Sequence, residues 1–83
     1  MKANLRNPAE SKDYNRIDNI INRAKGDRQK VLMHARNMAK SIKDPAKAWR
    51  RFNAALECRD SRVSGFVRQA MAEIFYQKAV ALG

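Results

Sequence analysis

The amino-acid sequence predicts an all-α fold, a compact four-helix domain packed either as a bundle or as an orthogonal cluster of helices. Three observations predict this fold. Apolar residues recur at spacings of three and four, and no long stretch alternates apolar and polar residues as a strand does. The three glycines and two prolines stand where helices would begin, end or bend. The length of 83 residues suits a single domain, 1–83.

The first helix is expected to begin at Asn7 or Ser11 and to end at Gly26. The segment from Asn7 to Glu10 has the form of a capping box, with a proline at the first helical position. A narrow apolar stripe follows: Tyr14, Ile17, Ile20, Ile21 and Ala24. Glycine ends the helix because it adopts the left-handed cap without strain. Residues 1–6 show no periodicity and are expected to fray.

Asp27 is placed to cap a second helix that runs to about Lys43. Its apolar face consists of Val31, Leu32, Ala35, Met38, Ala39 and Ile42. The opposite face is basic and consists of Lys30, His34, Arg36, Lys40 and Lys43. Met33 lies among these basic residues rather than in the apolar stripe.

Asp44 and Pro45 give the start signal for a third helix that ends near Arg59. One side is apolar, with Trp49, Phe52, Ala55 and Leu56, and the others carry Lys47, Arg50 and Arg51. Cys58 falls on the polar side, so we expect a partly exposed thiol there. Residues 59–62 are polar and predict the next turn.

The last helix is the most apolar and is expected to be the buried spine of the domain. Its broad apolar stripe consists of Val63, Phe66, Val67, Ala70, Met71, Ile74, Phe75 and Leu82. Gly65 either starts this helix or lies within it for close packing. Tyr76, with Gln69 and Ala72, predicts a partly apolar outer face.

The composition excludes several classes of protein. No apolar run approaches the roughly 20 residues of a membrane-spanning helix, and no apolar stretch of a secretory signal follows the N-terminus. The single cysteine, Cys58, allows no internal disulfide and no multi-cysteine zinc site. We therefore expect a cytoplasmic protein with no membrane partner.

The residues that enzymes use are scattered along the chain. The only histidine, His34, lies on a basic face, and nothing pairs it with Cys58 on another helix. The glycines are isolated and form no phosphate-binding loop. Several carboxylates serve as helix caps: Glu10, Asp27 and Asp44. The expectation is a protein that is not an enzyme, with no catalytic residue, metal or cofactor.

The outlying property of the sequence is its formal net charge of +10. Eight basic residues and one acid fall between Arg28 and Arg51, which gives that segment a net charge of +7. Because self-repulsion destabilises a compact chain, such an excess indicates an anionic partner, although it also serves solubility. We expect phosphate contacts from the basic residues around the turn at 44–45, which are Lys40, Lys43, Lys47, Arg50 and Arg51. Lys30 and Arg36, which come earlier on the second helix, extend this surface.

The sequence therefore predicts a small accessory protein that binds the backbone of DNA or RNA through its second and third helices, without reading bases. A helix-turn-helix fits poorly, because the helices that would read bases must bury their apolar faces. The alternative is an adaptor or inhibitor that docks on an acidic or nucleic-acid-handling protein, with Met33 and Tyr76 as exposed apolar contacts. The apolar stripe of the last helix also allows a homodimer.

Overall fold

The computed structural model describes residues 7–83, which form four α-helices and contain no strand. The helices are α1 (Ser11–Ala24), α2 (Arg28–Ser41), α3 (Pro45–Leu56) and α4 (Gly65–Leu82). The predicted all-α four-helix fold is therefore confirmed, whereas the expected fraying of residues 1–6 lies outside the described residues. Among residues 7–83, no helix is long and apolar enough to cross a membrane.

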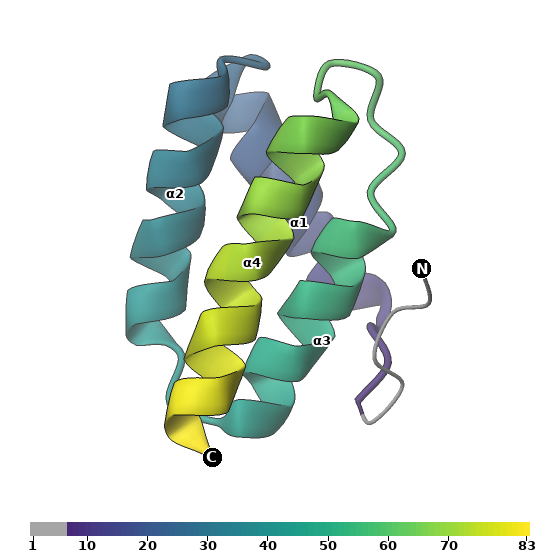
Figure 1. The fold of residues 1–83 in the computed structure, drawn as a ribbon. Coiled ribbons are helices and arrows are strands. Elements are labelled where there is room, and N and C mark those ends of the chain that lie inside the picture. Colours follow the sequence, from purple (N-terminus) through teal and green to yellow (C-terminus); the bar gives the residue numbers. More distant parts are fainter. Residues whose placement is uncertain (1–6) are drawn as a thin grey trace.

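The helices pack side by side as a bundle rather than as an orthogonal cluster (Figure 1). α4 packs on both α3 and α2, and α1 packs on the same two helices from the other side. The order around the bundle is therefore α1, α2, α4, α3, so that α2 and α3 stand diagonally opposite each other although they are joined by a short turn (Figure 1). The contact between α3 and α4 is the most extensive, consistent with α4 as the spine.

Most helix starts follow the predicted signals. The Asp27 carboxylate accepts a hydrogen bond from the Lys30 amide at 3.1 Å, and the Asp44 carboxylate accepts one from the Ala46 amide at 3.0 Å. α4 begins at Gly65, with the Ser64 hydroxyl accepting from the Val67 amide at 3.2 Å. Each of these side chains satisfies a backbone donor that the first helical turn leaves unpaired.

The first helix begins at Ser11, and the predicted cap at Asn7 is wrong. Glu10 is the residue in extended conformation before the helix, and its amide donates to the Asp13 carboxylate at 2.9 Å. α1 then ends at Ala24, where Lys25 and Gly26 both have left-handed backbones, with φ of 53° and 80°. α2 and α3 also end two or three residues before the predicted positions, at Ser41 and Leu56.

The core is built from one side of each helix, with three departures from the predicted pattern. The inward side of α4 is a row spaced by four residues: Val67, Met71, Phe75 and Ala79. Phe66 precedes this row by one residue and is 82 % exposed, so its assignment to the core is wrong. Ala72 is buried, not on the outer face. Cys58 is also buried, because α3 ends at Leu56 and the chain no longer follows the polar side of that helix.

Candidate nucleic-acid interface

The basic residues predicted to contact phosphate fall into two groups in the structure. One group is exposed to solvent: Lys30, Arg36, Lys40, Lys43 and Lys47. The other group is Arg50 and Arg51, which are half-buried and buried, respectively. The structure therefore does not bring all seven residues to one surface.

Arg50 and Arg51 are held by a carboxylate inside the protein. Asp13 of α1 is fully buried, and its Oδ1 accepts a hydrogen bond from Arg51 Nε at 2.9 Å. Arg50 Nε lies 3.3 Å from Asp13 Oδ2. Arg51 also places Nη1 at 3.0 Å from the sulfur of Met38 on α2. These contacts tie α3 to the neighbouring helices, so the two arginines serve as structural cations.

A groove between α1 and α2 gathers a different set of basic and polar side chains. It has a volume of about 720 Å³, and two residues of α3 also line it. We call it the basic groove; its lining is Arg16, Asn19, Ile20, Asn22, Arg23, His34, Asn37, Met38, Ser41, Ile42, Lys47 and Arg51. Among the described residues, no aspartate or glutamate lines this groove. Cations and neutral hydrogen-bonding groups therefore line it above a small apolar floor.

Arg16 and Arg23 form the α1 wall of the basic groove and were missed by the sequence analysis. They are exposed, and with Asn19 they recur at spacings of three, four and seven, which places them along one side of a helix. That spacing was a detectable signal. It did not identify a binding surface, however. Periodicity shows which side of its own helix a residue occupies, but it does not show how that helix is oriented relative to its neighbours.

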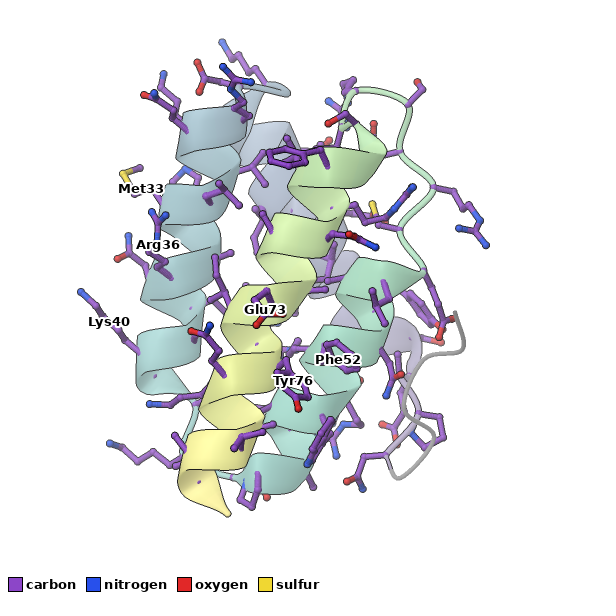
Figure 2. The ribbon with its side chains drawn as sticks, viewed as in Figure 1. Met33, Arg36, Lys40, Phe52, Glu73 and Tyr76 are labelled. Carbon is purple, nitrogen blue, oxygen red and sulfur yellow. The ribbon has the colours of Figure 1, made fainter. Side chains whose placement is uncertain are left out.

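The outer side of α2 continues the positive surface beyond the groove. We call the exposed residues Lys30, Met33, Arg36 and Lys40 the basic ridge. Figure 2 shows Met33, Arg36 and Lys40 along this side of the helix, with Met33 and Lys40 pointing away from the bundle. A second hollow of about 540 Å³ lies beside Lys30, Met33 and Arg36, and the helix cap Asp27 also lines it. No residue of α2 is acidic, so the ridge has no compensating carboxylate on its own helix.

Several acidic residues are paired with side chains that do not line the basic groove. Asp60 accepts hydrogen bonds from Arg62, at 2.6 Å for the closest, and these bonds lower the pKa of Asp60 to about 2. Glu57 accepts a hydrogen bond from the Tyr14 hydroxyl at 2.5 Å, which raises the pKa of Tyr14. Asp27 and Asp44 act as helix caps, and the buried Asp13 is paired with Arg51. The carboxylates of residues 7–83 therefore form no ion pair with the groove cations Arg16, Arg23 and Lys47.

The arrangement supports binding of an anion more readily than covalent chemistry. His34 is half-buried at the groove, whereas Cys58 is buried near the start of the α3–α4 loop. Within the described part of the chain, no three His, Cys, Asp or Glu side chains are grouped so that they could hold a metal ion. The groove offers guanidinium, ammonium, amide and hydroxyl donors, which are the groups that proteins direct at phosphate oxygens.

Comparisons of the chain with protein-family models, with curated proteins and with solved structures gave no significant match. We therefore infer function from the chemistry of the basic groove and the basic ridge.

Proposed function

We propose that this protein binds the sugar-phosphate backbone of nucleic acid through the basic groove and the adjacent basic ridge, as a small accessory protein without enzymatic activity. The observation that carries the proposal is a groove with lysine and arginine side chains from α1 and α3, polar side chains from α2, and no acidic lining residue. Each phosphate neutralised by Lys or Arg releases counterions from the nucleic acid, so this surface gains affinity without recognising a sequence.

The groove supplies two kinds of phosphate contact. Arg16 and Arg23 on the α1 wall have planar guanidinium groups that suit bidentate hydrogen bonds to phosphate. Asn37 and Ser41 on the α2 wall are neutral donors that position a backbone without adding charge. Lys47 of α3 adds an ammonium group to the groove lining, and the ridge extends the basic surface along α2.

Backbone binding accounts for this surface better than base recognition. Trp49 and Phe52 are buried between helices, so neither ring offers an open platform for stacking a base. Arg51 lines the groove, but its guanidinium is held by Asp13, so the proposed phosphate contacts use Arg16 and Arg23 of α1 and do not rely on Arg50 or Arg51.

The test is a binding titration of Arg23→Gln against a labelled DNA duplex, a single strand and an RNA hairpin at several salt concentrations. We expect weaker binding to all three ligands and a salt slope reduced by about one, because one phosphate contact is lost. Arg59→Gln is the matched control, since Arg59 is an exposed arginine outside the groove and the ridge. Equal losses in the two variants, or no binding of the wild-type protein at low salt, would contradict the proposal.

An acidic protein surface is the second candidate partner, and the position of Met33 favours it. This side chain is 45 % exposed in the middle of the basic ridge, where it adds an apolar contact that a phosphate backbone does not use. Capture of a partner from nuclease-treated lysate by the wild-type protein, and its loss with Met33→Ser, would support this candidate. Under backbone binding alone, Met33→Ser leaves the nucleic-acid titration unchanged.

A further inference from the structure

The outer side of α4 is a second surface, distinct from the basic groove. α2 and α3 cover the flanks of this helix, and one side remains open. We call that side the α4 face; its exposed residues are Phe66, Gln69, Glu73, Tyr76, Gln77 and Val80. Of the four large hydrophobic side chains exposed in residues 7–83, three lie here: Phe66 at 82 %, Val80 at 56 % and Tyr76 at 41 %.

The α4 face carries a negative charge, whereas the composition of the chain predicts a positive charge for an average part of its surface. Its six residues include one acid, Glu73, and no base, although the chain has a net charge of +10. The two basic residues of α4, Arg68 and Lys78, are half-buried and not part of the face. Arg68 instead donates a hydrogen bond to the Cys58 carbonyl at 2.9 Å. Two copies of this chain can therefore approach through the α4 face without bringing lysines and arginines together.

The α4 face also has a rigid aromatic support. The Tyr76 ring lies 5.7 Å from the Trp49 ring and 5.6 Å from the Phe52 ring, measured between centroids. Figure 2 shows Tyr76 beside Phe52 at the seam of α3 and α4, with Glu73 on the same side of the molecule. Because two buried rings already fix Tyr76, docking against it loses less side-chain entropy than docking against a free side chain.

We propose that a second copy of this chain covers the α4 face, forming a two-fold symmetric homodimer in which the two α4 helices run antiparallel. In such an isologous contact the same residues meet in both directions. A register that sets Phe66 opposite Tyr76 of the second copy also sets Gln69 opposite Glu73. This register pairs two aromatic rings, matches an amide donor with a carboxylate, and keeps the two Glu73 side chains from facing each other.

The dimer leaves the proposed nucleic-acid surface open. α1 stands diagonally across the bundle from α4 (Figure 1). The lining of the basic groove includes no residue of α4, so covering the α4 face leaves the groove open. Dimerisation and phosphate binding are therefore separable, and each is tested without the other.

The experiment is sedimentation velocity on nuclease-treated protein over a concentration series. We expect a dimer for the wild-type chain. Phe66→Lys and Tyr76→Lys should each raise the dimer dissociation constant by more than about tenfold, because these two residues face each other in the register and the symmetric contact then loses two apolar groups and gains two cations. Both positions are exposed, and circular dichroism checks that the variants keep the wild-type helix content.

The control is Asn15→Lys, which adds the same charge at an exposed position on α1, across the bundle from α4. It should leave the dimer intact. A wild-type chain that stays monomeric at its highest soluble concentration overturns the proposal. So does a dimer that survives both α4 substitutions, or one that dissociates equally with Asn15→Lys. A failure to bind nucleic acid leaves these outcomes unaffected.

Discussion

The Asp13 carboxylate shows how strongly one buried group organises this bundle. It accepts a hydrogen bond from Arg51 Nε at 2.9 Å and lies 3.3 Å from Arg50 Nε. Its own side chain is not exposed to solvent. A buried ion pair is not by itself evidence of high stability, because the desolvation of its charges opposes their attraction. Removing one partner is nevertheless costly, since it leaves the other charge buried and uncompensated.

We therefore expect Asp13→Asn to destabilise the fold by about 3–5 kcal/mol, as a broken buried pair does. Urea denaturation followed by circular dichroism measures the free energy of unfolding. Asp18→Asn is the matched control, because Asp18 is exposed on the same helix and should change stability by less than about 0.5 kcal/mol. Equal losses in the free energy of unfolding would show that the buried contacts of Asp13 with the two arginines do not stabilise the fold.

Single residues also mark the limit of sequence-based prediction of the site. Lys40 and Lys47 lie on polar sides of their helices by periodicity, and the structure places both in solvent. The same periodicity places Arg51 on a polar side of its helix. In the structure Arg51 is buried, because it donates a hydrogen bond to Asp13, which lies 38 residues earlier in the sequence. Charge and spacing do not distinguish a cation that faces water from one that faces a distant buried carboxylate.

At the scale of the helix, the α1–α2 turn depends on two consecutive left-handed residues. Gly26 has φ of 80°, and a β-carbon built on it would lie 3.2 Å from the β-carbon of Arg62. Any other residue at this position would therefore adopt an unfavourable left-handed backbone. Its β-carbon would also lie very close to Arg62 of the α3–α4 loop.

Gly26→Ala should lower the free energy of unfolding by about 1–2 kcal/mol, from the left-handed strain alone. The contrast is Gly65→Ala, at the first position of α4, where the backbone is not left-handed and the added β-carbon meets only the end of the Arg68 side chain. That variant should be neutral or slightly stabilising, because alanine favours the helix. Thermal melts of the two variants side by side measure the difference, and similar melting temperatures would contradict the expectation.

Helix starts were more predictable than helix faces. Asp27 and Asp44 were identified as caps because the acid immediately precedes the helical pattern, a local relation that the sequence contains. The exposure of Phe66 was not predictable in the same way. It depends on which side of α4 the neighbouring helices cover, and an apolar residue at the edge of a broad stripe fits the core equally well by periodicity.

For the whole molecule, the principal unknown from sequence was the order of helices around the bundle. Periodicity predicted four amphipathic helices and left their arrangement open. The observed order places α1 rather than α3 beside α2 and creates the basic groove. Arg16 and Arg23 therefore gain their proposed role from an arrangement that only packing decides.

The net charge of +10 on a molecule measuring 32 × 24 × 21 Å makes its stability sensitive to salt. The screening length is about 30 Å at 0.01 M salt and about 8 Å at 0.15 M, so repulsion across the whole molecule operates at the lower value and is screened at the higher. We expect the melting temperature to rise over this range, measured by circular dichroism. An unchanged or falling melting temperature would mean that the positive charges do not repel appreciably in the folded state.

The aromatic seam between α3 and α4 has a practical consequence for measuring how the protein opens. Trp49 is the only tryptophan, and its ring contacts Phe52 and Tyr76, so its emission reports on that half of the bundle. Helix α1, which builds one wall of the basic groove, has no such probe. If α1 detaches before the rest unfolds, the ellipticity changes while the emission stays constant. Coincident transitions in the two signals would instead indicate that the four helices unfold as one cooperative unit.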